Sequence, residues 1–214
     1  MRANGLRLAL QSAVFAFAFT AIGHAADEGG GGSTQGFHAK VEYCQTCHGL
    51  SAEGYRGYVV MPRLAGQQPE YVENQLRAFT ERRRLNPVMV NVTHGLTPGM
   101  IRALAEHFKS MNPPPYGGAP RESLALGKSI FDTGLPEANV PACSACHGPD
   151  GKGQNQIPRL AGQLYWYTVK TLSSWSRERG QGSAKDISAI MSPTAHNLTP
   201  SQVSAIAAYV SNLR

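Results

Sequence analysis

Two copies of one five-residue string contain all four cysteines of this chain: Cys-Gln-Thr-Cys-His at residues 44–48 and Cys-Ser-Ala-Cys-His at residues 143–147. In this spacing, both thiols can form thioethers with one porphyrin while the adjacent histidine binds its iron. The strings therefore predict two covalently attached haem c groups. The residues assigned to thioether bonds and iron ligation are Cys44, Cys47 and His48 in the first string and Cys143, Cys146 and His147 in the second.

Two other uses of paired cysteines remain open from the sequence. A disulfide across only two intervening residues is strained or redox-active, and thioredoxin-like chemistry would need a βαβ frame that the flanking sequence does not show. Zinc would need both pairs together, but the strings lie 99 residues apart. A zinc ribbon separates its pairs by only about 15–20 residues. The spacing therefore favours haem.

The strings belong to a longer internal repeat. The segment Pro-Arg-Leu-Ala-Gly-Gln occurs at residues 62–67 and again at residues 158–163. A methionine also recurs, at Met89 and Met191, and five residues after each one the sequence reads His-x-Leu-Thr-Pro. Between the Pro-Arg-Leu-Ala-Gly-Gln segment and this methionine, the second half contains six more residues than the first. Self-similarity of this extent predicts two halves with the same fold.

The apolar periodicity predicts helices. Each half ends in an amphipathic helix, for which Thr97 and Thr199 are good N-caps, each followed by proline at the first helical position. Middle helices are expected over about 69–83 and 164–179, and a shorter helix should lead into each string. Alternating strand patterns are scarce, so we predict an all-α fold.

The chain divides into five predicted parts. Two arginines followed by a short apolar run are typical of a cleaved signal peptide, although the run leaves an uncleaved anchor open. The parts are the signal peptide (1–25), a flexible glycine-rich leader (26–35), a first domain (36–112), a Pro/Gly linker (113–120) and a second domain (121–214). Because such short domains bury little apolar surface, the apoprotein should fold poorly without haem.

The second axial ligand decides what the iron can do. Outside the leader, only Met89 and Met191 recur as a matched pair of methionines, and we expect both in a non-helical approach to the last helix of their half. A thioether ligand raises the reduction potential. The repeat-matched His94 and His196 leave bis-histidine ligation as an alternative. With His and Met bound, no coordination position remains for a substrate, so the chain should transfer electrons and not act as an enzyme.

The formal charge of +6 overstates how basic the exported protein would be. Without Arg2 and Arg7, 18 basic residues stand against 14 acidic ones, a balance of +4. Four haem propionates would bring the total close to zero. The charge therefore gives no support to a nucleic-acid partner. The cluster 82–84 (Arg-Arg-Arg) fits a solvated helix end better than a docking patch for an acidic protein.

These motifs resemble the dihaem cytochrome c4 family, which is related to single-haem class I cytochromes of the c-553 type. The resemblance extends over about residues 36–214 and rests on the strings, the Pro-Arg-Leu-Ala-Gly-Gln segments and the methionine before Leu-Thr-Pro. It implies two tandem class I cytochrome c domains, each folded around one haem. It also implies that the backbone carbonyls of Pro62 and Pro158 accept hydrogen bonds from the ligand histidines. Arg63 and Arg159 would lie near the haem propionates.

The same resemblance implies a role in the bacterial periplasm. The protein would carry single electrons from a respiratory donor complex to a terminal oxidase or another acceptor, as a monomer, with peripheral membrane association left open. One alternative is a permanent electron-transfer subunit of a larger periplasmic dehydrogenase or oxidase. Another is a dihaem peroxidase-type enzyme, which would need an open iron. The halves differ after each string, at 49–51 against 148–151, so the two haems should differ in potential.

Overall fold

The computed structural model describes residues 34–179 and 186–214. The signal peptide predicted for residues 1–25 and most of the leader predicted for 26–35 lie outside this part of the chain. From Gly31 onward the chain forms one compact unit. Within the described ranges it is mostly helical, and one small antiparallel sheet pairs β1 (Tyr55–Arg56) with β2 (Val60–Met61).

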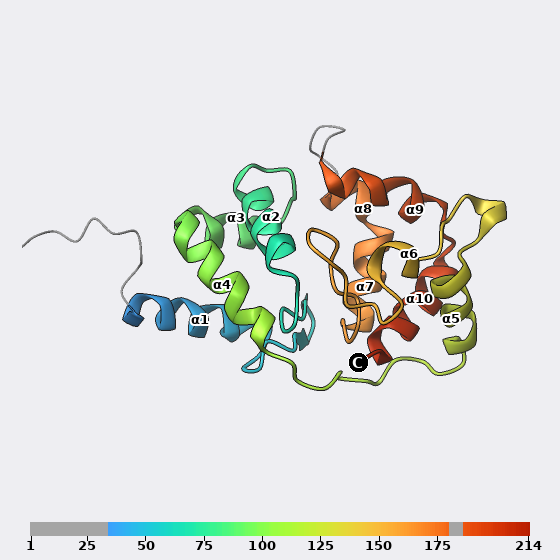
Figure 1. Cartoon of the computed structure of the whole chain (residues 1–214), viewed down its shortest axis with the longest axis horizontal. Helices are drawn as coiled ribbons and strands as arrows, with labels where there is room; N and C mark the ends of the chain where they lie inside the picture. The colour runs from blue at the N-terminus through green and yellow to red at the C-terminus, as the bar shows by residue number, and fades with distance from the viewer. Residues whose placement is uncertain (1–33, 180–185) are drawn as a thin grey trace, which may run out of the picture. The chain divides into compact units, whose positions relative to one another are not determined.

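The helices follow the repeat (Figure 1). Those of the first half are α1 (Thr34–His48), α2 (Pro69–Thr80), α3 (Pro87–His94) and α4 (Pro98–Ser110). Those of the second half are α5 (Leu124–Thr133), α6 (Ser144–His147), α7 (Tyr165–Ser173), α8 (Trp175–Glu178), α9 (Met191–Asn197) and α10 (Pro200–Asn212), with 3-10 turns η1 (Pro136–Ala138) and η2 (Ile187–Ile190).

The last helix of each half begins as the sequence predicts. The Thr97 hydroxyl accepts a hydrogen bond from the Met100 N–H, and Pro98 occupies the first position of α4. Thr199 forms a complete capping box with Gln202 at the start of α10. These caps satisfy N–H groups that a helix terminus otherwise leaves unpaired. The predicted end helices are therefore confirmed.

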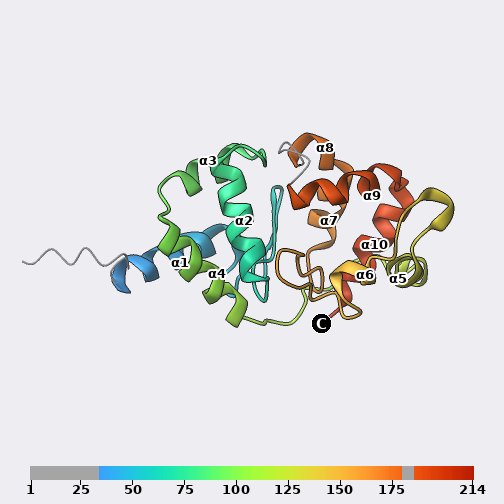
Figure 2. The same ribbon diagram turned by 45° about the horizontal axis from the view of Figure 1, so that its top comes forward.

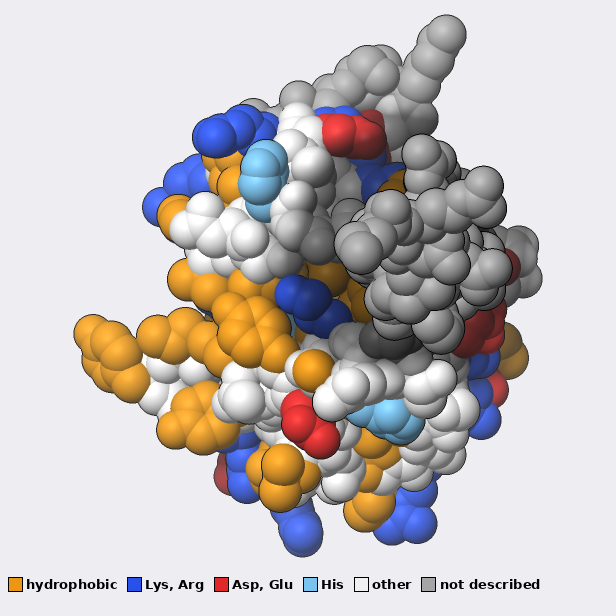
Figure 3. Space-filling view, turned by 90° about the vertical axis from the view of Figure 1, so that its left-hand side faces the viewer, with side chains coloured by type: hydrophobic (Ala, Val, Ile, Leu, Met, Phe, Trp, Pro, Cys, Tyr) orange, Lys and Arg blue, Asp and Glu red, His pale blue; other side chains and the backbone are white. Residues whose placement is uncertain are grey.

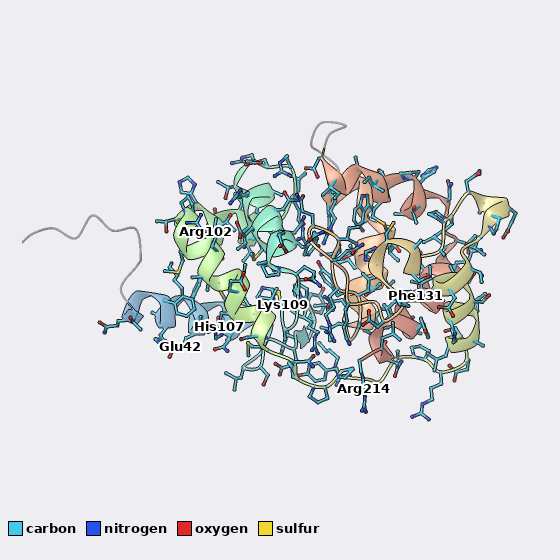
Figure 4. All side chains as sticks on the ribbon, in the orientation of Figure 1. Glu42, Arg102, His107, Lys109, Phe131 and Arg214 are labelled. Carbon is cyan, nitrogen blue, oxygen red and sulfur yellow. The ribbon has the colours of Figure 1, made fainter. Side chains whose placement is uncertain are left out.

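Each half has its own apolar core. In both views of the ribbon, α4 runs beside α2, and α10 contacts α5 and α7 (Figures 1 and 2). The first core joins Val41, Ala52, Ala65, Leu104 and Phe108, and the second joins Ile130, Phe131, Ile206 and Val210. Phe131, labelled on α5 in Figure 4, contacts Tyr209 with the two rings tilted and their centroids 5.3 Å apart. Cys44 packs on the first core and Cys143 on the second, so each haem string is anchored to a core.

The helices before the strings and in the middle of each half differ in detail from the prediction. In the first half α1 begins at Thr34 and continues through the string, whereas in the second half α5 and the short α6 are separate. The middle helix α2 ends at Thr80, and Arg82 just beyond it has a left-handed φ of 58°. The matching helix of the second half breaks at Ser174 into α7 and α8.

The prediction that both repeated methionines lie outside helices is wrong. Met89 lies inside α3, and Met191 is the first residue of α9. The side chain of Asn86 accepts a hydrogen bond from the Met89 N–H at 3.1 Å, and Pro87 fills the first helical position. This N-cap stabilises a helix whose apolar residues show no helical period. Both methionines therefore project from helices of defined geometry.

Gly127 allows α5 and α10 to cross closely. A Cβ atom at this position would lie 2.0 Å from the Ala205 carbonyl oxygen of α10. We expect Gly127→Ala to destabilise the second half by about 1–3 kcal/mol, because the helices would have to move apart. Urea unfolding of the holoprotein measures the change. Gly95→Ala is the control, since no atom lies within 4 Å of a Cβ there; equal effects of the two substitutions would contradict the close crossing.

Candidate haem sites

The cysteines of the two strings occupy matching environments. Cys44 and Cys143 are half-buried, Cys47 and Cys146 are exposed, and all four are free thiols. Burial raises the pKa of the Cys44 thiol and raises that of Cys143 to about 11. A redox-active Cys-x-x-Cys motif lowers the pKa of its attacking thiol instead. The structure therefore gives no support to a disulfide or thioredoxin-like use of these cysteines.

Zinc finds no support either. Across residues 34–179 and 186–214, no three His, Cys, Asp or Glu side chains gather in a way that could hold a metal ion. A structural zinc site takes four such ligands in a tetrahedron.

The histidines of the strings are buried and held in one orientation. His48 Nδ1 lies 2.8 Å from the Pro62 carbonyl oxygen, and His147 Nδ1 lies 2.8 Å from that of Pro158. A carbonyl oxygen can only accept, so Nδ1 must carry the proton in both rings. Burial also lowers the pKa of both imidazoles. Each ring is therefore neutral, with the Nε2 lone pair available for iron. These are the two proline contacts that the resemblance implies.

One cavity in the second half brings the predicted ligands together. Its lining includes Cys143, Cys146, His147 and Met191, and the remaining wall is formed largely by apolar and aromatic side chains. Among these are Leu160, Leu172, Trp175, Leu198, Ile206 and Val210. Two thiols, an imidazole and a thioether around an apolar space fit a covalently attached haem with His/Met ligation.

The matching residues of the first half lie on two of its helices. His48 ends α1, and Met89 lies half-buried on α3, which packs against α2. His94 and His196, the alternative ligands, are exposed at or next to the ends of α3 and α9. His196 is not part of the cavity lining, whereas Met191 is. In the second half, the cavity lining therefore favours methionine over histidine as the second ligand.

Arg63 and Arg159 are buried charges, with only 3% and 7% of their surfaces exposed. The Arg63 guanidinium donates to the backbone carbonyls of Ala65 and Pro113, and Arg159 Nε donates to the Ala161 carbonyl. Neither takes part in an ion pair within the described ranges. Burial and the nearby Arg159 charge lower the pKa of Arg63 to about 10. Because a buried cation requires a counter-charge, haem propionates would fit here.

The arginine cluster at 82–84 does not behave as the solvated helix end that the sequence favours. Arg83 forms ion pairs with Glu81 and with Asp186 of the second half. Arg84 donates at 2.8 Å to the Tyr167 hydroxyl, also in the second half, and Arg82 is the one exposed residue of the three. The cluster thus joins the two halves, a role that no local sequence signal indicates.

Sequence reasoning also missed a buried cluster around Arg179. Its guanidinium donates to the hydroxyls of Tyr71 at 3.0 Å and Tyr167 at 2.9 Å. The Arg84 and Arg179 charges, outweighing burial, lower the pKa of Tyr167 to about 8. Tyr71 comes from the first half and yet lines the second-half cavity, as Arg179 does. The repeat matches Tyr71 with Tyr167, which was the available signal.

Comparison with known proteins gives consistent matches. The cytochrome c family model matches residues 124–214. Cytochrome c4 of Thiocapsa roseopersicina is 36% identical over 89% of this chain and 98% of its own length. Cytochrome c-552 of Acidithiobacillus ferridurans is 35% identical over 79% of this chain and 73% of its own.

Two further comparisons concern partners and structure. The thiosulfate dehydrogenase electron acceptor of Stutzerimonas stutzeri is 34% identical over 79% of this chain and 78% of its own length. A solved structure of cytochrome c4 from Acidithiobacillus ferrooxidans superimposes with a TM-score of 0.70 at 34% identity, covering 80% of this chain and 99% of that chain.

Proposed function

The chain belongs to the dihaem cytochrome c4 family, and from that premise we propose that it carries single electrons in the periplasm through two His/Met-ligated haems. Its relatives are electron-transfer proteins that bind haem c, and two class I cytochrome c domains account for its helical fold. The predictions of family, fold class and cofactor are therefore confirmed. The ligands, domain boundaries, compartment and partners are proposals.

The lining of the second-half cavity is the observation that supports the proposed haem attachment and iron ligands. Cys143 and Cys146 would hold the porphyrin edge, while His147 and Met191 would bind iron from opposite sides. The repeat assigns Cys44, Cys47, His48 and Met89 the same roles in the first half. The bound haem supplies a one-electron couple. The protein residues keep both coordination positions filled and neutralise the propionates with Arg63 and Arg159.

Exposed apolar residues beside the methionines favour transient contacts with partners. Val88 and Ile190 immediately precede Met89 and Met191, and 61% and 65% of their surfaces are exposed. Hydrophobic side chains also gather on the face of the first half that Figure 3 shows. The relative named as an electron acceptor of thiosulfate dehydrogenase supports a dehydrogenase as the donor. The terminal oxidase as acceptor is what the family resemblance implies. Permanent attachment to such a dehydrogenase is the second candidate.

The domain boundaries and the leader complete the proposal. Helix α4 ends at Ser110 and α5 begins at Leu124, and the intervening residues contain no helix, which supports a linker at 113–120. Residues 1–25 would direct export and then be removed. Within the described ranges, none of the helices combines the length and the apolar character needed to cross a membrane.

A visible spectrum with redox titration of the purified holoprotein tests this function. We expect two haems per chain, two one-electron steps and no carbon monoxide binding at neutral pH, because methionine fills the last position. Carbon monoxide binding by the native protein would instead favour the peroxidase class. Gel filtration separates the two carrier proposals: a free carrier elutes as a monomer, and a permanent subunit elutes with its dehydrogenase.

A further inference from the structure

Two repeated glutamines bind the backbone of the opposite half with both ends of their amides. Gln163 Oε1 accepts from the Arg63 N–H at 2.9 Å, and Gln163 Nε2 donates to the Arg63 carbonyl at 3.1 Å. Gln67 makes the same pair of bonds with Arg159, at 2.7 and 3.1 Å. All four residues are buried, with less than 9% of their surfaces exposed. The contact is therefore reciprocal and shielded from water.

The peptide groups held by these glutamines also hold the histidines. The Arg63 N–H belongs to the same planar peptide as the Pro62 carbonyl. That carbonyl accepts the hydrogen bond from His48 Nδ1 at 2.8 Å. One hydrogen-bonded chain therefore runs from the His48 ring through the peptide to Gln163, which lies in the other half of the protein.

The second half contains the matching chain. His147 Nδ1 donates to the Pro158 carbonyl at 2.8 Å, and the N–H of the same peptide belongs to Arg159, which Gln67 binds. Both of these hydrogen-bonded chains pass from one half of the protein to the other, so each histidine ring connects to the glutamine of the opposite half.

Such a chain changes the basicity of the ring. When a peptide N–H donates a hydrogen bond, its carbonyl becomes more negative and a better acceptor, an effect that is larger in a buried, low-dielectric setting. A stronger acceptor at Nδ1–H makes the imidazole a more basic ligand. A more basic ligand stabilises ferric iron, so the reduction potential falls.

We propose that Gln163 tunes the haem bound through His48 and that Gln67 tunes the haem bound through His147. Both are positioning residues that act through a peptide group and across the contact between the halves. The inference depends on the proposed roles of His48 and His147 as iron ligands. It makes each haem's potential depend on the presence and correct docking of the other half.

Gln68 provides a matched control because it also joins the halves without reaching either histidine ring. Its Nε2 donates to the carbonyls of Lys152 at 2.8 Å and Gly153 at 2.9 Å. Its Oε1 accepts from the ammonium of Lys109, labelled on α4 in Figure 4. Gln68→Leu therefore removes amide contacts between the halves, one of them part-buried, while leaving both Pro–Arg peptides intact.

The test uses Gln163→Leu, Gln67→Leu and Gln68→Leu in the full holoprotein. Redox titration followed by NMR reports each haem separately. With Gln163→Leu, the ferric-to-ferrous ratio of the His48 haem should fall about two- to tenfold at a fixed electrode potential. The His48 Nδ1–H signal should shift, and the His147 signal should not. Gln67→Leu should give the mirror image, and Gln68→Leu should change neither ring signal.

Gln163→Glu is a second variant in case the leucine variants assemble poorly. A carboxylate is a stronger acceptor than an amide, so the His48 Nδ1–H signal should move in the direction opposite to that in Gln163→Leu. For this variant the test is the His48 Nδ1–H signal and not the potentials. Position 163 also lines the second-half cavity, so a new charge there would change the potential of the second haem directly.

Four results would overturn the inference: a ring shift confined to the mutated half, equal shifts in both rings, shifts of the same sign for leucine and glutamate, or no shift. These results are distinct from failure of the proposed function. That failure would appear as carbon monoxide binding or a colourless native protein before any glutamine is changed.

Discussion

Met191→Ala should lower the potential of the second haem by a few tenths of a volt and open its iron to carbon monoxide. The thioether stabilises ferrous iron, and axial ligands as a class move haem potentials over about 0.8 V. Because Met191 lines the same cavity as His147, its removal leaves one face of that iron without a protein ligand. The first haem should keep its potential. Redox titration and carbon monoxide difference spectra measure both effects.

Met89→Ala should give the same changes at the first haem alone. Met100→Leu is the control, since Met100 packs on the first core but has no methionine partner in the repeat. Unchanged potentials in both alanine variants would show that the methionines do not bind iron. The exposed His94 and His196 would then be the ligands to replace next.

The features found from sequence are those fixed by repeated, chemically specific residues. Two haem strings, two Pro-Arg-Leu-Ala-Gly-Gln segments and two capped end helices all appear in the structure at the expected positions. Each depends on local chemistry that one copy alone would suggest and a second copy reinforces. The contact of each histidine with its proline carbonyl was expected only from the family resemblance, and the structure contains it in both halves.

The helix that contains Met89 shows why apolar periodicity can fail to predict a helix. Residues 87–94 read Pro-Val-Met-Val-Asn-Val-Thr-His, and three valines in eight residues lower the helix propensity. Its only sequence signal is the cap, Asn86 followed by Pro87. Tertiary packing against α2 supplies the rest, and packing is not visible in a pattern of residue types.

The contacts between the halves could not be predicted from the sequence for a different reason. Arg83 meets Asp186 and Arg84 meets Tyr167 only because the two halves dock in one particular way. A cluster of like charges is typical of a solvated surface, which is why the sequence favoured that interpretation. The two repeat-matched pairs, Gln67 with Gln163 and Tyr71 with Tyr167, carried a usable signal, because a polar residue that is repeated in both halves points to a buried partner.

Removing both thioethers of the second half should leave that half unfolded. In Cys143→Ala/Cys146→Ala the chain loses one of its two haems, and the cavity that the porphyrin would fill loses its largest apolar occupant. Domains of this size have little core to spare, so the second half should no longer unfold cooperatively. Trypsin offers a sharp readout: Arg159 and Arg179 are buried, with 7% and 5% of their surfaces exposed, and should become cleavable.

Graded variants separate haem loss from the loss of two thiols. Cys146→Ala alone removes the exposed cysteine and keeps one thioether, so that variant should retain both haems and resist trypsin at Arg159 and Arg179. The mirror variant, Cys44→Ala/Cys47→Ala, should expose Arg63 instead. If the double variant of the second half keeps its arginines protected and unfolds at the native urea midpoint, the apolar core holds the fold without the porphyrin. Haem would then contribute nothing to the stability of this half, and its attachment would serve electron transfer alone.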